Sequence, residues 1–362
     1  MNIDINQASL PRSPLPTFQQ RFYHECIDGS AIAPSLYNAA VEIVEDTGFW
    51  EPNRALNQRV SIQWQTHKPH AYGAIAFFKQ ESGECWQGKP ENPRVDGKGK
   101  TVKYEKPVES GADAYLPPVN IQTRQAIQQN YPDLTVPLEG SFWDWVVSIP
   151  SAPITFTEGG KKALALLTQG TIAIALVGVN GVYRKLESGA RALIADVERF
   201  TVPGRQITLA FDQDAAPKTR RRVQVALSRF GALLKASGAD VAIAEWASSN
   251  GKGVDDLIAA HGVEAWESAL SNRLTLDEWN IWNRLENRLN IPAHVPTNVS
   301  DLSKIDIAEI PSTGIIAIAG GKGTGKTKWL AHQITAERGA IALGHRITLM
   351  RNLCDRLGLD YR

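Results

Sequence analysis

The sequence predicts an α/β protein centred on a compact, doubly wound parallel sheet. Between residues 150 and 265, apolar runs alternate with segments of helical pattern, and the runs are Ile154–Thr157, Ile172–Val177, Ile207–Phe211 and Val241–Ala244. Strands that are apolar on both faces and joined by helices are typical of a parallel sheet. A glycine-rich turn near residue 320, between an apolar run and a helical segment, predicts a second α/β unit that begins like a P-loop domain.

Helices are expected between the strands of the central sheet. Apolar residues recur with the helical period over Lys161–Leu167, Ala190–Phe200 and Val223–Lys235. A crossover helix after each strand is what a parallel sheet requires. The region 151–265 is therefore predicted to be one domain with helices on both faces of its sheet.

The N-terminal region has a different pattern. Residues 1–20 contain several prolines and show no periodicity, which predicts a tail. From 21 to 150, short apolar pieces are broken by Gly, Pro and Asn, which favours an α+β domain with a small sheet. Ala74–Lys79 and Cys85–Gly88 flank a turn-like segment and predict a hairpin, and Thr101–Tyr104 predicts another strand.

Two further regions complete the predicted organisation. Residues 266–305 combine tryptophans with many charges and end in Pro292 and Pro296, which predicts a helical connector and a linker. Residues 306–362 begin a new unit with the apolar run Gly314–Ala319 and continue for one further βα step. This last region is expected to be the first βαβ part of a P-loop NTPase domain.

Composition excludes several classes of protein. The chain of 362 residues is 43% hydrophobic and 21% charged, as expected for globular domains and not for a disordered or collagen-like chain. Its 39 basic and 38 acidic residues nearly cancel, so contact with nucleic acid has to come from local patches. Its three cysteines are too widely spaced for a disulfide framework or a zinc pair, and no apolar run reaches the length of a membrane span. We expect a cytoplasmic protein that does not contact membranes.

Acidic side chains follow the predicted strands where those strands end. Glu158 ends the first strand, Asp212 and Asp214 follow the third, and the segment Gly251–Asp256 follows the fourth. The carboxyl ends of parallel strands meet at one edge of a doubly wound sheet, where ligands bind. Carboxylates in an Asp-x-Asp pair suit Mg²⁺, or Mn²⁺, which binds through few carboxylates together with water and phosphate. The alternative for an isolated Asp-x-Asp or Glu is a solvated turn or a helix cap.

The order of these acids resembles the TOPRIM domain of bacterial-type primases, topoisomerases and some nucleases, over roughly residues 150–262. The resemblance implies that Glu158 is the general acid/base and that Asp212 and Asp214 are catalytic metal ligands. Asp255 matches the family's later acidic segment less closely and is a further candidate ligand. Glu158 is included among the residues that face the metal.

The flanking segments resemble cyanobacterial-type plasmid replication proteins, in which a primase-like TOPRIM region precedes a helicase. The segments that carry this resemblance are Phe49–Asn57, Lys103–Pro107, Tyr115–Pro118 and Gly323–Thr327. It implies a role in plasmid DNA replication, with single-stranded template and nucleotides as partners and replication origin DNA as a further possible partner.

The C-terminal region contains a phosphate-binding pattern that fits GxxxxGK[ST]. Its candidate ATP-binding residues are Gly320, Gly321, Lys322, Gly323, Thr324, Gly325, Lys326 and Thr327. Backbone N–H groups would hold the phosphates, Lys326 would reach the β and γ oxygens, and Thr327 would bind Mg²⁺. Gly344–Leu349 resembles a segment of superfamily-two helicases, yet the residues after Thr327 contain no apolar run ending in Asp-Glu. We therefore expect ATP binding by a truncated helicase unit without efficient hydrolysis.

Basic residues near the predicted carboxylates are candidates for nucleic-acid contact. They are Lys218, Arg220, Arg221 and Arg222, which follow Asp214, and Lys252, which lies in the segment after the fourth strand. Phosphate of a template or nucleotide is the favoured partner, and a solvated helix face is the alternative.

The function predicted from the sequence is that of a primase-like nucleotidyltransferase that uses Mg²⁺ on a single-stranded template. A TOPRIM-type nuclease would use the same acids on a phosphodiester. A non-catalytic replication initiator that binds ATP is the third alternative. A topoisomerase is disfavoured because no separate tyrosine-bearing cleavage domain is evident.

Overall fold

The structure is a computed structural model of the chain. It describes residues 16–58, 60, 69–111, 113–187, 189–289, 301–304, 318, 323–334 and 347–360. The chain divides into two units, residues 1–276 and 277–362. The predicted boundaries at residues 150 and 265 stay predictions.

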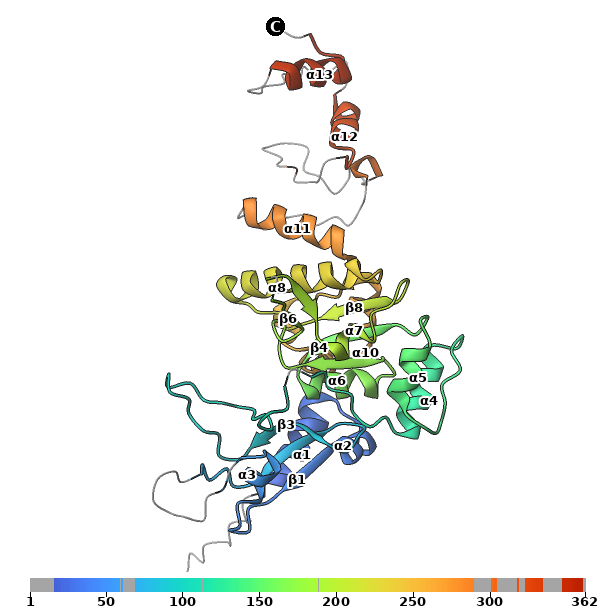
Figure 1. The fold of residues 1–362 in the computed structure, drawn as a ribbon. Coiled ribbons are helices and arrows are strands. Elements are labelled where there is room, and N and C mark those ends of the chain that lie inside the picture. The colour runs from blue at the N-terminus through green and yellow to red at the C-terminus, as the bar shows by residue number, and fades with distance from the viewer. Residues whose placement is uncertain are drawn as a thin grey trace, which may run out of the picture. The chain divides into compact units, whose positions relative to one another are not determined.

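A five-stranded sheet lies at the centre of the first unit (Figure 1). Its strands are β4 (Ile154–Glu158), β5 (Ala173–Leu176), β8 (Gln206–Ala210), β9 (Asp240–Ile243) and β10 (Leu274–Thr275). The strand order is β10-β9-β8-β4-β5, in which β5, β4, β8 and β9 pair in parallel and only β10 is antiparallel. The four predicted strands and their parallel arrangement are confirmed.

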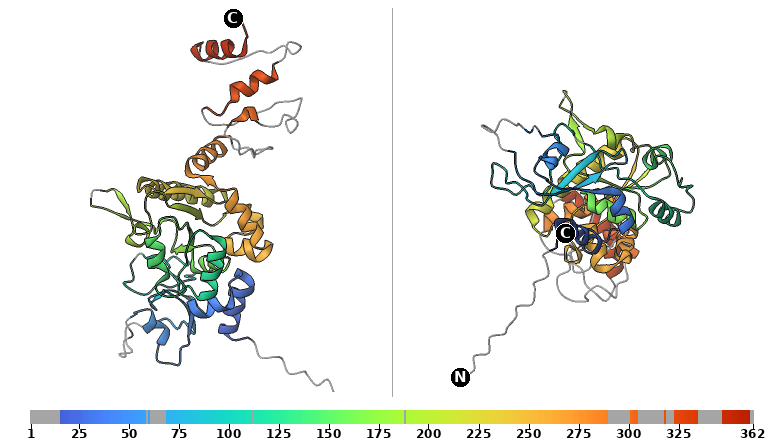
Figure 2. Two further views of the ribbon diagram at one scale, coloured as in Figure 1. Left: turned by 90° about the vertical axis from the view of Figure 1, so that its right-hand side faces the viewer. Right: turned by 90° about the horizontal axis from the view of Figure 1, so that it is seen from below.

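Helices cover both faces of this sheet (Figure 1 and Figure 2). They are α6 (Gly160–Thr168), α7 (Ala195–Glu198), α8 (Pro217–Ala236), α9 (Val254–His261) and α10 (Val263–Ser271), with a short 3-10 turn at Ser248–Asn250. The connections through α6 and α8 run in opposite directions along the sheet, so right-handed crossovers place these helices on opposite faces. The ring of Phe230 in α8 lies 5.6 Å from Phe156 and 6.5 Å from Phe211, which fixes α8 over β4 and β8.

One predicted helix, Ala190–Phe200, is wrong in its first half. Residues Arg191–Leu193 form strand β7, which pairs antiparallel with β6 (Tyr183–Lys185), and only α7 is helical. Leu193 pairs with Tyr183, and the backbone is still extended at Ile194, with a φ of −68° and a ψ of 152°. The apolar spacing of this segment fits either structure, so pairing with β6 decides the outcome.

The N-terminal part of the first unit combines helices with a small antiparallel sheet. Its elements are α1 (Phe18–Ser30), α2 (Pro34–Ala40), β1 (Val41–Val44), α3 (Glu51–Ala55), β2 (Ile75–Lys79), β3 (Cys85–Pro90), α4 (Ile121–Asn130) and α5 (Phe142–Ser148). The strand order is β1-β2-β3, which confirms the predicted hairpin and adds β1. The predicted strand at Thr101–Tyr104 is wrong, because Thr101 makes only an isolated bridge to Val95 around a turn held by Asp96.

In the second unit the structure describes three helices and one turn. They are α11 (Leu276–Leu289, whose first residue ends the first unit), α12 (Lys326–Gln333), α13 (Ile347–Leu357) and a 3-10 turn at Leu302–Lys304. Apart from Ile318, the predicted strand 314–319 lies outside the described residues, as do residues 344–346 of the segment 344–349, whose other three residues begin α13. Across the described part of the chain, no helix combines the length and apolarity needed to span a membrane.

Candidate catalytic site

Three predicted carboxylates leave the sheet at neighbouring strand ends. Glu158 is the last residue of β4, and Asp212 and Asp214 follow β8. The two strands are parallel neighbours, and Thr157 pairs with Ala210. The register therefore directs all three acids to one edge of the sheet.

Two lysines hold the aspartates. Lys162 Nζ lies 3.0 Å from Asp212 Oδ1, and Lys252 Nζ lies 3.2 Å from Asp212 Oδ2 and 3.5 Å from Asp214 Oδ1. The aspartate side chains are only 14% and 18% exposed, whereas that of Lys252 is 59% exposed. One ammonium group thus bridges two largely buried carboxylates from the solvent side.

The backbone of the fourth strand end positions Lys252. Its carbonyl oxygen accepts a hydrogen bond of 2.8 Å from Gln213 N–H, between the two aspartates. A Cβ at Gly253 would overlap Lys162 Cε and Asp255 Oδ1, so glycine permits this close approach without displacing either side chain. The Asp-x-Asp loop and the Gly-Lys-Gly segment are therefore joined by a backbone hydrogen bond.

Glu158 has the electrostatic environment of an acid/base group. Burial raises the pKa of its carboxyl, and the negative charge of Asp212 raises it further, while Lys162 and Lys252 act in the opposite direction. A Cβ at Gly178, in the loop after β5, would lie 3.8 Å from Glu158 Oε1. Glu158 therefore lies between the loop after β5 and the aspartates after β8.

Asp255 has a different environment from the other three acids. It is 4% exposed, and its Oδ2 accepts a hydrogen bond of 3.0 Å from the Ser30 hydroxyl at the end of α1. Burial raises the pKa of Asp255, although Lys162 and Lys161 oppose that shift. This geometry favours a structural role, and it lends no support to the predicted place of Asp255 among the metal ligands.

Asp212 and Asp214 are candidate ligands for a metal ion. Among the described residues, no group of three or more His, Cys, Asp or Glu side chains has the geometry to hold one. Asp212 and Asp214 nevertheless share the cationic Lys252 ammonium, and two carboxylates with water and phosphate suffice for Mg²⁺. The donor set fits a single hard cation bound through this pair.

The predicted basic residues lie at the start of α8. Lys218, Arg220, Arg221 and Arg222 are all exposed, within eight residues of Asp214 in the sequence. Their contact with nucleic acid stays a prediction. Lys252 is an ion-pair partner of the aspartates here, a contact that the sequence alone did not predict.

Sequence reasoning missed Lys162 and a neighbouring, partly buried ion pair. Lys161 Nζ lies 2.9 Å from Glu25 Oε1 of α1, and Lys89 pairs with the same carboxylate. The available signal was the pair of adjacent lysines in the first turn after Glu158. One lysine turns to the aspartates and the other to α1, so the first turn of α6 joins the site to the N-terminal region.

The described part of the predicted P-loop is Gly323–Thr327, whereas Gly320, Gly321 and Lys322 lie outside the described residues. A helix follows the glycine-rich turn, as predicted: α12 begins at Lys326, after Gly325 with a φ of 72°. Lys326 Nζ donates a hydrogen bond of 3.2 Å to Thr324 Oγ1. The helix N-terminus expected of a phosphate cradle is thus present, and ATP binding stays a prediction.

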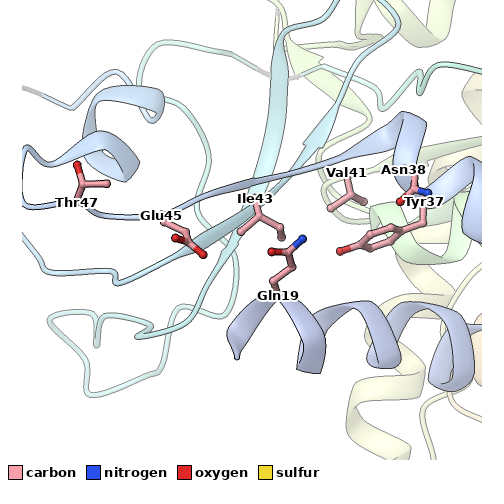
Figure 3. Close-up of a pocket in the computed structure, with 7 residues that line it drawn as sticks. All are labelled: Gln19, Tyr37, Asn38, Val41, Ile43, Glu45 and Thr47. Atoms are coloured by element: carbon pink, nitrogen blue, oxygen red, sulfur yellow. The ribbon is translucent and has the colours of Figure 1, made fainter. Parts of the chain in front are cut away.

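A separate cavity of about 600 Å³ lies between α1 and β1 (Figure 3). Its lining residues are Gln19, Tyr37, Asn38, Val41, Ile43, Glu45 and Thr47. None of the predicted site residues lines this cavity. It is therefore distinct from the carboxylate site.

Comparison with known proteins gives one family match and several similar chains. The family described as a domain of unknown function (DUF3854) matches residues 142–265, which include the carboxylates and both lysines. An uncharacterized protein of Picosynechococcus sp. is 35% identical over 370 residues, which cover 94% of this chain and 36% of that protein. The chain thus spans about a third of the length of this curated relative.

Solved primase structures are also similar to this chain. The DnaG catalytic core has a TM-score of 0.45 at 13% identity and covers 96% of this chain and 92% of its own. A DNA primase domain from Pseudomonas aeruginosa has a TM-score of 0.44 at 14% identity, with 93% of this chain and 89% of its own covered.

Proposed function

We propose that this chain is a primase-like nucleotidyltransferase that joins nucleotides on a single-stranded DNA template in DNA replication. The observation that carries the proposal is the set of three carboxylates at neighbouring parallel strand ends, of which two share one ammonium group. Such an edge is where α/β sheets bind ligands. The raised pKa of Glu158 adds a carboxylate that binds a proton more tightly than an exposed glutamate does.

Asp212 and Asp214 would hold Mg²⁺ or Mn²⁺, and Thr327 would hold the Mg²⁺ of ATP in the second unit. A divalent ion bound by the aspartates would favour the ionised 3′ hydroxyl and offset negative charge on the phosphate. Lys162 keeps Asp212 in a fixed orientation, because its own side chain is only 19% exposed. Lys252 is more exposed and can leave the aspartates to contact a substrate phosphate.

Glu158 would accept the proton of the attacking 3′ hydroxyl. Burial and the neighbouring Asp212 raise its pKa, so its carboxylate is a stronger base than an exposed glutamate. The proton acceptor and the aspartate pair lie at the ends of adjacent parallel strands, so both would face a substrate bound at this edge. The proposed partners are template DNA and nucleotides, with plasmid origin DNA as a further partner.

The test is incubation of the protein with single-stranded template, Mg²⁺ and labelled nucleotides. Labelled oligomers that require template and Mg²⁺ are expected, and they should vanish with Asp212→Asn/Asp214→Asn. Asp240→Asn is a matched control, because this exposed aspartate begins β9 at the opposite edge of the same sheet. Unchanged synthesis in the double variant would overturn the proposed site.

Other products would identify another function. A shortened template would indicate a nuclease that uses the same acids. Retention on DNA without any turnover would indicate a non-catalytic initiator. Either outcome, obtained without oligomer synthesis, would overturn the primase proposal.

A further inference from the structure

Strand β7 of the β6–β7 hairpin contacts helix α8, which covers one face of the central sheet (Figure 1). The hairpin starts directly after the loop that carries Gly178, which approaches Glu158. Helix α8 starts three residues after Asp214. Both elements therefore begin at the catalytic carboxylates.

The first half of α8 extends past the sheet. No residue from 217 to 225 is buried, whereas Ala226, Leu227, Phe230 and Leu234 are. At 1.5 Å per residue, these nine residues form an overhang of about 14 Å. The overhang begins at the carboxyl edge, because α8 follows the end of β8.

One basic residue of this overhang lies on the side that faces the sheet. Arg220 precedes Leu227 by seven residues and Phe230 by ten, so it continues the buried stripe of α8. Helical side chains also lean toward the N-terminus, which here is the carboxyl edge. Arg222 and Arg229 lie on the opposite, exposed stripe.

The hairpin carries its own positioned arginine. The Arg191 guanidinium lies 5.2 Å from the centre of the Tyr183 ring, and the Tyr183 hydroxyl lies 3.2 Å from Asn180 Oδ1. Leu193 is buried and pairs with Tyr183, so the face that carries Tyr183 and Arg191 is turned toward the protein. Arg184 pairs with Ala192 and projects from the other face.

We propose that Arg191 and Arg220 form a backbone-binding site for single-stranded nucleic acid above the catalytic carboxylates. Both side chains are exposed, and residues 183–193 and 215–225 contain one acid, Glu187, in a chain whose total charge is only +1. Guanidinium groups bind phosphate oxygens in a bidentate manner. The Tyr183 ring already holds the Arg191 guanidinium in place before a phosphate binds. This inference rests on the proposed function, since it supplies the path by which a template reaches Glu158 and Asp212.

The test compares two double variants of equal charge. Arg191→Gln/Arg220→Gln removes the two inward arginines, and Arg184→Gln/Arg229→Gln removes outward arginines of the same hairpin and helix. Affinity for a labelled 20-nucleotide oligo-dT would be measured by anisotropy from 50 to 300 mM salt. Thermal unfolding would confirm that both variants keep the fold, which is expected because all four side chains are exposed.

The inward variant should bind oligo-dT roughly tenfold more weakly, and the slope of log affinity against log salt should become shallower by about 1.4. The outward variant should stay within about twofold of the original protein. Equal losses in both variants, or no loss in the inward variant, would overturn the inference. A loss confined to Mg²⁺-ATP binding, with oligo-dT unaffected, would overturn it as well.

The outcome is separate from that of the proposed function, because oligo-dT binding needs no turnover. Selective loss of binding in the inward variant, with no oligomer synthesis by the original protein, would support this surface and refute the primase proposal. Oligomer synthesis with unchanged binding in the inward variant would support the enzyme and refute the surface.

Discussion

Replacing Asp255 distinguishes a structural carboxylate from a metal ligand. Asp255 accepts a hydrogen bond from Ser30, which lies 225 residues earlier, and the two residues are 4% and 0% exposed. Burial raises the pKa of Asp255, which means that the folded protein favours its neutral form. We expect Asp255→Asn to fold normally and Asp255→Ala to be destabilised.

The direction of the Asp255 pKa shift determines whether a variant gains or loses free energy of unfolding. A carboxyl whose folded pKa is raised stabilises the protein below its unfolded pKa, and this contribution is lost as the pH rises through the folded value. Ionisation of Asp255 in the folded protein therefore carries a cost that Asp255→Asn removes. Asparagine still accepts from Ser30, whereas alanine leaves that hydroxyl buried without its acceptor, at a cost of about 1–3 kcal/mol.

Urea unfolding at pH 7 measures both effects. Asp255→Asn should match or exceed the free energy of unfolding of the original protein, and Asp255→Ala should fall by the amount given above. Ser30→Ala combined with each variant tests whether the loss arises at this hydrogen bond. A drop in metal affinity in Asp255→Asn as large as that in Asp212→Asn/Asp214→Asn would refute the reasoning, because Asp255 would then be a ligand.

Three other predictions concern different parts of the chain. Lys326→Ala should weaken ATP binding by about ten- to a hundredfold, measured by calorimetry, since it removes a charge-assisted contact, and this chain should show negligible ATP turnover in a coupled phosphate assay. Cys26 is fully buried and its pKa is raised to about 12, so iodoacetamide at pH 8 should leave it unlabelled in the native protein and label it in urea, as read by mass spectrometry. Burial raises the pKa of Glu25, but hydrogen bonds from Lys89 and Lys161 outweigh it and hold that pKa below 4.5. Glu25→Gln should therefore cost about 1 kcal/mol in urea unfolding at pH 7 and nothing at pH values below the folded pKa, and an equal loss at both would contradict the assignment.

The parallel sheet and the position of its acids could be predicted because both depend on local sequence and topology. An apolar run fixes each strand, and parallel pairing then brings the residue after each strand to one edge. Glu158 and Asp212 lie at neighbouring strand ends for this reason. The hairpin at Arg191 could not be predicted, because its apolar spacing also fits a helix and only pairing with Tyr183–Lys185 selects the strand.

The roles of the lysines and of Asp255 depend on contacts that no local pattern encodes. Lys161 and Lys162 are adjacent in the first turn of α6, yet one pairs with Glu25 of α1 and the other with Asp212. Likewise, Lys252 faces the aspartates while Asp255, three residues later, faces Ser30. Each of these two residue pairs lies at the start of a helix. Side chains that are close in sequence point in different directions there, so the two members of a pair contact different partners. The same turns thus contact the candidate carboxylates and connect α1 to the sheet, so displacement of α1 would be transmitted to the candidate site through Lys161 and Asp255.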